Sequence, residues 1–156
     1  MLLISENSTR NYASRNAGGK GFNLYVMTKA GLNVPKWVVL GPETFERFKE
    51  LSGINESFIA LEESEAPLKE LSKSIEDLIM NTPLPGLVEE FISTSFKKLG
   101  KDLISVRSSA LDEDGSSHSF AGQLSSYLYV QDQATVLESV KKCWASAYSE
   151  RGLVYR

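Results

Sequence analysis

The sequence has one cysteine and one histidine among its 156 residues, and it has no long apolar run. Because Cys143 stands alone, an intrachain disulfide and every zinc site that needs several cysteines are excluded. Because His118 is the only histidine, any site that needs two imidazoles is excluded as well. No stretch reaches the roughly 18 apolar residues that a membrane-spanning helix needs, so we expect no membrane partner.

A basic excess is also missing, since 20 acidic residues outnumber 17 basic ones and give a net charge of −3. The chain therefore lacks the excess of basic residues that is usual in a nucleic-acid-binding protein. It still allows a local basic pocket for a phosphorylated small molecule. Met1 to Ser5 lack the basic start and the cleavage pattern of a signal peptide, so the expected location is cytoplasmic.

Hydrophobic periodicity predicts a mixture of helices and strands in one domain. An irregular polar stretch, 5–16, leads to glycines at 18, 19 and 21 and then to a helix ended by Gly31. The expected apolar face of that helix carries Phe22, Val26 and Ala30. Strands are expected at 37–40, 103–108 and 124–130, and helices after Pro42, within 52–66, at 68–79, at 87–99 and after Asp132. Strands and helices do not alternate regularly, which predicts the α+β class.

The last strand carries an expectation about which side chains share a face, and the last helix one about which side chains are buried. Strict alternation places Leu124, Ser126, Leu128 and Val130 on one face of the strand and Ser125, Tyr127 and Tyr129 on the other. Asp132 is expected to be the N-cap of the helix that follows it. The side chains of this helix that are expected to point inward are those of Val136, Val140, Cys143, Trp144 and Ala147.

A loop of about fifteen residues, 109–123, separates the last two strands and is rich in Ser, Asp and Gly. Loops of this length within a compact domain are commonly functional. Small residues at Ser119, Ala121 and Gly122 would let backbone N–H groups approach an anion. A flexible hairpin loop that binds nothing explains the composition equally well.

Two cations lie beside segments that suit a phosphate. If Val106 points into the core, Arg107 points to the other face, where its planar guanidinium could bond two phosphate oxygens. Lys20 lies among glycines at a helix start, where backbone donors and the helix dipole favour an anion. The spacing is not that of a Walker A loop, because Ser14 and Gly21 occupy the positions that decide it. A surface arginine and a solvated lysine are the alternatives.

Other candidate residues carry weaker signals. His118 has no cysteine or second histidine as a partner, which favours an exposed loop histidine over a catalytic one. Cys143 lies on an apolar helix face and is expected to fill the core. Asp112, Glu113 and Asp114 could hold a metal ion, but such a run more often caps a loop or pairs with a cation. No metal site within the chain is predicted.

Several of these segments resemble the phosphoenolpyruvate synthase and pyruvate phosphate dikinase family. The resemblance covers about 18–156, and its middle, about 52–101, matches only in helical character. The motifs that carry it are Gly18-Gly19-Lys20-Gly21-Phe22-Asn23-Leu24, Ala30-Gly31-Leu32-Asn33-Val34-Pro35, Val106-Arg107-Ser108-Ser109-Ala110, Glu113-Asp114, Ser119-Phe120-Ala121-Gly122-Gln123, Cys143-Trp144-Ala145-Ser146 and Tyr155-Arg156.

The resemblance implies an ATP-grasp nucleotide-binding domain in which Lys20 and Arg107 hold the phosphates of ATP and serve as catalytic residues. The nucleotide-binding loop that covers the phosphates matches Ser119, Phe120, Ala121, Gly122 and Gln123. In the family, the phosphoryl group passes from ATP to a histidine on a swivelling domain and then to pyruvate. The implied cofactors are therefore ATP and Mg²⁺, and the implied partners are the phosphohistidine and pyruvate-binding domains.

The resemblance stops partway through the family's nucleotide domain, so 1–156 corresponds to the N-terminal part of it. The second ATP-grasp lobe, the magnesium ligands and the domains for phosphohistidine and pyruvate would lie outside the chain. Asp112, Gly115 and Ser116 also depart from the family pattern. We therefore expect the isolated chain to be inactive as an enzyme. A phosphotransferase with another acceptor, such as an antibiotic or a glucan, and a non-catalytic nucleotide-binding or interaction module remain as alternatives.

Overall fold

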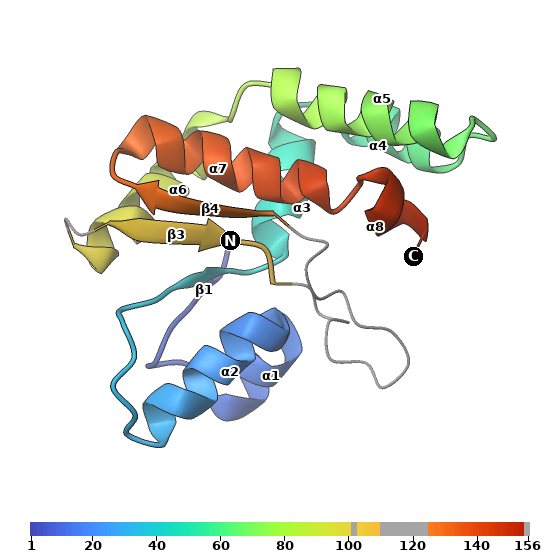
Figure 1. The fold of residues 1–156 in the computed structure, drawn as a ribbon. Coiled ribbons are helices and arrows are strands. Elements are labelled where there is room, and N and C mark those ends of the chain that lie inside the picture. The colour runs from blue at the N-terminus through green and yellow to red at the C-terminus, as the bar shows by residue number, and fades with distance from the viewer. Residues whose placement is uncertain (101–102, 110–124, 155–156) are drawn as a thin grey trace.

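The computed structural model describes residues 1–100, 103–109 and 125–154 and has the mixed helix and strand content of the α+β class (Figure 1). The described helices are α1 (Arg10–Asn16), α2 (Gly18–Lys29), α3 (Glu43–Leu51), α4 (Asn55–Glu62), α5 (Leu68–Asn81), α6 (Gly86–Leu99), α7 (Gln133–Ser146) and α8 (Glu150–Val154). The described strands are β1 (Leu3–Ile4), β2 (Val39–Leu40), β3 (Ile104–Arg107) and β4 (Ser126–Val130). They form two antiparallel pairs, β1 with β2 and β3 with β4.

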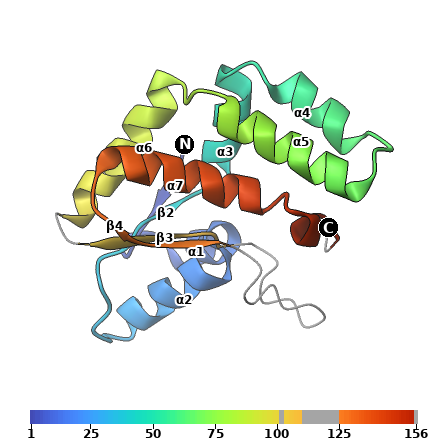
Figure 2. The same cartoon turned by 45° about the horizontal axis from the view of Figure 1, so that its top comes forward.

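The helices lie in layers around the β3–β4 pair. Helix α7 covers one face of that pair, and α5 and α6 pack against α7 (Figure 1). Helices α1 and α2 lie on the opposite side of the pair (Figure 2). The two strands thus separate a large helical layer from a small N-terminal unit. None of the described helices is long and apolar enough to cross a membrane.

The larger core lies between α7 and helices α3 to α6. Its buried members include Phe48, Phe58, Ile75, Ile79, Val88, Ile92, Val136 and Val140. Aromatic rings from distant segments meet there, since the Phe48 ring lies 5.2 Å from that of Trp144 and the Phe58 ring 5.0 Å from that of Tyr148. The apolar spacing that predicted α3, α5, α6 and α7 is confirmed for most of its residues, but Leu51, Leu68 and Leu87 on these stripes are 38%, 39% and 59% exposed.

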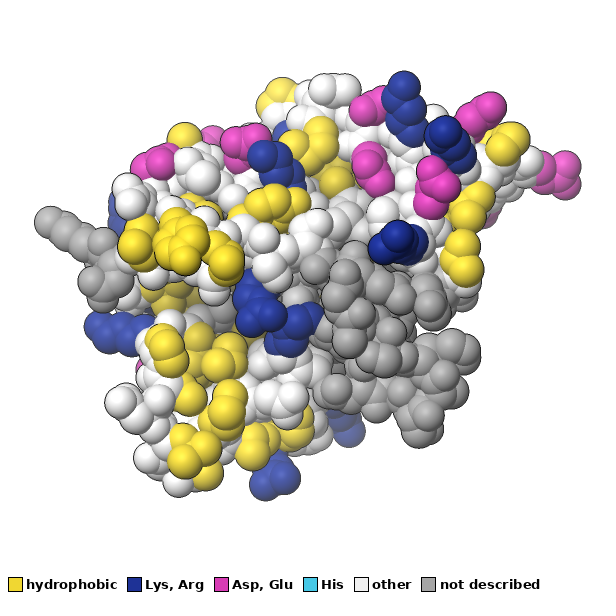
Figure 3. All heavy atoms as spheres, viewed as in Figure 1, with side chains coloured by type: hydrophobic (Ala, Val, Ile, Leu, Met, Phe, Trp, Pro, Cys, Tyr) yellow, Lys and Arg dark blue, Asp and Glu magenta, His cyan; other side chains and the backbone are white. Residues whose placement is uncertain are grey.

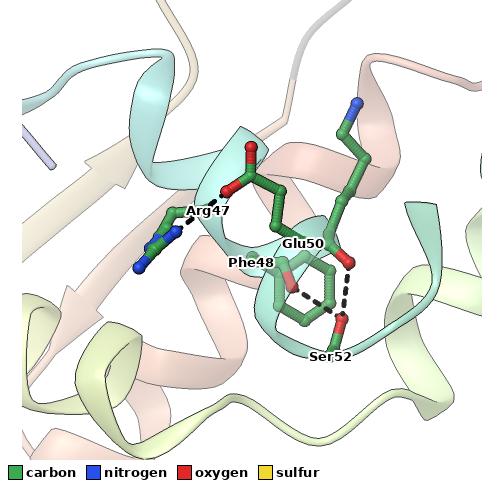
Figure 4. Close-up of polar contacts among 5 residues, drawn as sticks. Arg47, Phe48, Glu50 and Ser52 are labelled. Carbon is green, nitrogen blue, oxygen red and sulfur yellow. Dashed lines mark hydrogen bonds and ion pairs between the residues drawn. The ribbon is translucent and has the colours of Figure 1, made fainter.

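Local hydrogen bonds define where helices begin and end. Asp132 caps α7 as predicted, since the Thr135 amide donates to its Oδ1 at 2.9 Å. At the end of α3, the Ser52 hydroxyl donates to the Phe48 carbonyl at 2.6 Å, beside the ion pair of Arg47 with Glu50 (Figure 4). The Phe48 carbonyl also accepts the Ser52 amide at 3.0 Å, so the hydroxyl adds a second hydrogen bond at the end of the helix.

The alternation of faces predicted for β4 is wrong, because it fails inside the strand. Val130 is 2% exposed and Tyr127 packs against the same core, whereas Leu128 and Tyr129 are 59% and 76% exposed. The pairing shifts by one residue between Ile104 and Val106, and Tyr129 adopts a φ of +59°. A bulge of this kind places two residues of one strand opposite a single residue of the other and turns both outward here.

Two predictions for the N-terminal unit are also wrong. Residues 10–16 form α1, capped by Thr9, where an irregular stretch was expected. Helix α2 buries Gly18, Gly21 and Tyr25, and Val26 on the predicted apolar face is 39% exposed. The reason is tertiary, because α2 turns its glycine face toward the core that contains Ala13 and Trp37. The left-handed residue that ends α2 is Gly31, with a φ of +76°, as predicted.

We expect Lys141→Met to destabilise the protein, because the Lys141 ammonium closes the end of α5. Its Nζ donates to the carbonyls of Met80 and Thr82 at 2.7 and 2.6 Å. Losing two charged hydrogen bonds from a partly exposed group should cost about 1–2 kcal/mol, which lowers the melting temperature by about 3–6 °C. The matched control is Lys142→Met, since the Lys142 ammonium instead pairs with Glu138 on the surface and lies 5.8 Å from the centre of the Tyr127 ring. Equal melting temperatures for the two variants would contradict this role.

Candidate functional site

The end of β3 meets the start of α2, and a serine joins them. The Ser109 hydroxyl donates to the Ala17 carbonyl at 2.8 Å and accepts a hydrogen bond from the Gly21 amide at 3.1 Å. These partners lie 92 and 88 residues away in the sequence. The contact therefore fixes two distant segments against each other, one carrying Lys20 and the other carrying Arg107.

The glycines at the start of α2 make this close approach possible. A Cβ at Gly18 would overlap the Ser109 carbonyl oxygen and lie 2.5 Å from its Oγ, and the residue has a φ of +67°. A Cβ at Gly21 would lie 2.8 Å from a methyl carbon of Val39. Residues three apart share a face of a helix, so these two glycines form a flat contact surface. Sequence reasoning treated the segment as a phosphate-binding turn and missed its packing role.

Arg107 lies on the face of β3 that is turned away from α7. Its side chain is exposed and its Nε donates to the Ser126 hydroxyl on the neighbouring strand at 3.3 Å. Val106, the residue before it, is half-buried and packs against the larger core. The predicted opposition of Val106 and Arg107 is therefore confirmed, and it directs the guanidinium to the side where α2 begins.

Lys20 lies in the first turn of α2, half-buried between Gly19 and Gly21. Its neighbour Gly21 bonds to Ser109, which follows Arg107 by two residues. Two residues of extended chain span at most about 7 Å, so the backbones of the two cations are held close together. Figure 3 shows Lys and Arg side chains over the region between the β3–β4 pair and α2.

The remaining predicted site residues lie outside the described residues. These are Ser119, Phe120, Ala121, Gly122 and Gln123 of the expected nucleotide-binding loop, together with Asp112, Glu113, Asp114 and His118. Within the described ranges, no three His, Cys, Asp or Glu side chains are grouped so that they could hold a metal ion. A hollow of about 940 Å³ within these ranges is lined by residues of α4, α5 and the turns beside them, and none of its lining belongs to α2 or β3.

Cys143 is a core residue, as predicted. Its thiol is buried, and burial raises its pKa from the usual 9.0 to about 11.

Since the unfolded Cys143 thiol loses its proton near pH 9 and the folded one near pH 11, the folded state binds more protons between these pH values. We therefore expect the free energy of unfolding to fall between these pH values by about 1–2 kcal/mol more in the native protein than in Cys143→Ala. Denaturant titrations at pH 8 and pH 10.5 test this, and parallel losses in both proteins would contradict it.

Comparison with known proteins agrees with the resemblance read from the motifs. Residues 14–156 match the family model described as pyruvate phosphate dikinase, AMP/ATP-binding domain. A probable phosphoenolpyruvate synthase from Methanothermobacter thermautotrophicus is 34% identical over 90% of the chain and 22% of its own length. A probable phosphoenolpyruvate synthase from Staphylothermus marinus is 36% identical over 89% of the chain and 18% of its length.

The similarity extends to a relative whose name states a different activity. The rifampicin phosphotransferase of Bacillus cereus is 35% identical over 89% of the chain and 17% of its own length. The chain thus spans about a fifth of the length of the relatives it matches. Because the family model covers nearly all of the sequence, the chain belongs to the AMP/ATP-binding domain family of pyruvate phosphate dikinase.

Proposed function

We propose that the chain binds ATP through Lys20 and Arg107 and so contributes to phosphoryl transfer. The observation that carries the proposal is the Ser109 contact, which holds the backbone beside Arg107 against the backbone beside Lys20. Two cations on adjacent segments suit a polyphosphate, which carries several negative charges over a few ångströms. Membership of an AMP/ATP-binding family supports a nucleotide as the source of these phosphates.

The residues present fit such a ligand by their chemistry. The Arg107 guanidinium offers planar donors that can bond two phosphate oxygens at once, and Lys20 supplies a point charge near the start of a helix. Phosphoryl transfer requires little covalent chemistry from the protein, so positioning and charge neutralisation would be their contribution. The nucleotide-binding loop, Ser119 to Gln123, would cover the phosphates, and magnesium would arrive with ATP and take its protein ligands from outside the chain.

In the wider protein, we propose that 1–156 forms the N-terminal part of an ATP-grasp domain. A second lobe would complete the nucleotide site, and a histidine on another domain would accept the phosphoryl group. Phosphoenolpyruvate synthesis from pyruvate is the first proposed activity, because phosphoenolpyruvate synthases recur among the similar relatives. The chain by itself would be inactive, since both acceptors lie elsewhere.

A different final acceptor is the second candidate. The named rifampicin phosphotransferase is as similar to the chain as the named phosphoenolpyruvate synthases are, at 35% against 34% and 36% identity. Proteins with different acceptors thus share this segment to the same degree. We infer that acceptor choice depends on residues outside the segment.

Calorimetric titration of ATP with magnesium into the purified protein tests the proposal. We expect the native protein to bind ATP and Lys20→Ala to bind it with a dissociation constant about tenfold larger. The reason is that a charged hydrogen bond contributes roughly 1.5 kcal/mol or more. Lys29→Ala is the matched control, since Lys29 lies at the other end of α2, where its ammonium lies 5.5 Å from the centre of the Tyr25 ring. Equal weakening by both variants, or no binding by the native protein, would contradict a phosphate site at Lys20.

A further inference from the structure

The Ser109 hydroxyl occupies an unusual place at the start of α2. In a regular helix beginning after Ala17, the Gly21 amide would donate to the Ala17 carbonyl as the first i to i−4 pair. Here the Gly21 amide donates to Ser109 Oγ, and the same hydroxyl donates to the Ala17 carbonyl. A side chain from the end of β3 therefore bridges the two backbone groups that open the helix.

This bridge replaces a cap that the helix does not have locally. The residue at the N-cap position of α2 is Ala17, which has no side-chain oxygen to accept a backbone amide. Asp132 does supply one to α7 and Thr9 one to α1. The start of α2 thus depends on a residue that comes after β3, and it tolerates that residue only because Gly18 leaves room for it.

We propose that Ser109 is a positioning residue of the ATP site, acting through the two cations on either side of its bridge. The proposal rests on the proposed binding of ATP by Lys20 and Arg107. Lys20 precedes the bridged Gly21 by one residue, and Arg107 precedes Ser109 by two, so the hydroxyl sets the separation of the segments that carry them. Without it, α2 and the end of β3 shift relative to each other and the two charges no longer fit one polyphosphate.

Ser108 provides a matched control beside Ser109 in the chain. Its hydroxyl donates to the Ser125 carbonyl at 3.4 Å, within the β3–β4 region, and not to α2. Both serines are partly buried and both bond to backbone. Replacing either by alanine removes the same atom, but only Ser109→Ala breaks the connection to the helix that carries Lys20.

The experiment measures ATP–magnesium affinity by calorimetry and the Gly21 amide by NMR in the native protein, Ser109→Ala and Ser108→Ala. We expect Ser109→Ala to weaken ATP binding about tenfold and to shift the Gly21 amide resonance, and Ser108→Ala to change neither. In an Arg107→Ala background, Ser109→Ala should weaken binding by less than about threefold, because its effect acts through that arginine. If Ser109→Ala does not fold, Ser109→Cys, which keeps a weak donor and acceptor, takes its place with the same expected order.

The outcomes separate this inference from the function on which it rests. Native affinity in Ser109→Ala with a lowered melting temperature would mean that the serine is only structural and would overturn the inference. A tenfold loss that persists unchanged in the Arg107→Ala background would also overturn it, since no coupling to the arginine would then exist. Absence of ATP binding in the native protein would overturn the proposed function first, and the positioning role with it.

Discussion

Gly18→Ala is expected to lower the free energy of unfolding by about 3 kcal/mol, because it combines a strained backbone with a steric clash. The left-handed conformation alone costs a residue with a Cβ roughly 1–2 kcal/mol. At Gly18 the added Cβ would also overlap the Ser109 carbonyl oxygen and lie 2.6 Å from its carbonyl carbon. Backbone atoms cannot move aside as a flexible side chain can. The melting temperature should fall by about 10 °C, and ATP should bind more weakly because the end of β3 is displaced from α2.

Gly31→Ala separates the cost of the left-handed backbone from the cost of the steric clash. Gly31 has a φ of +76°, close to that of Gly18, but a Cβ there would meet no atom within 4 Å. This variant should therefore lose only the conformational part, about 1–2 kcal/mol, and should keep the ATP affinity of the native protein. Thermal melting and calorimetry of both variants check the comparison. Equal losses of stability in the two would mean that the packing of Gly18 on Ser109 carries no energetic weight.

Arg107→Ala is expected to reduce ATP-dependent phosphoryl transfer in the complete protein at least about a hundredfold. A charged hydrogen bond contributes roughly 1.5–3 kcal/mol, and two such bonds from one guanidinium to phosphate oxygens exceed the 2.7 kcal/mol that correspond to a hundredfold. Stability should change by only about 0.5 kcal/mol, since the side chain is exposed and its hydrogen bond within the described residues, to the Ser126 hydroxyl, is long at 3.3 Å. The measurement is phosphorylation of the acceptor by labelled ATP, with melting curves alongside.

Two further variants sharpen the interpretation of Arg107. Arg107→Lys keeps the charge but loses the planar fork, so its activity should lie between those of the native protein and Arg107→Ala. Arg47→Ala is the matched control, because Arg47 forms an exposed ion pair with Glu50 on α3, away from β3. Losses from Arg107→Ala and Lys20→Ala should not add, since both act on the same phosphates. A near-native rate of phosphoryl transfer in Arg107→Ala would contradict the phosphate-binding role and would mean that Arg107 is an ordinary surface residue.

Local sequence signals predicted the elements whose burial pattern is periodic. The apolar faces of α5, α6 and α7 all contribute to the larger core. The spacing of apolar residues alone therefore predicted that residues such as Ile75, Ile92 and Val140 are buried there. Gly31 and Asp132 were found for a similar reason, because a left-handed end and an N-cap depend on one residue type each. The positions of Val106 and Arg107 followed from the alternation of a short strand.

The features that sequence reasoning missed depend on partners far along the chain. The buried face of α2 begins with glycines, and Ser109, 88 residues after Gly21, packs against Gly18 there, which no local count of apolar residues reveals. The shift in β4 depends on its pairing with β3, which turns Tyr129 outward and Tyr127 inward. The spacing of Gly18 and Gly21 was the one available signal of close packing, and it was interpreted as a phosphate-binding turn.

For this protein, the sequence by itself determined the longer helices, the α+β class, the family and the two cations, since each depends on residue types at fixed spacings. Only the tertiary structure decided how those cations are related in space. The Ser109 hydroxyl reaches α2 because glycines remove the side chains that would hold the segments apart. Which backbones approach closely is a property of packing between distant segments, and the chain's local preferences do not specify it.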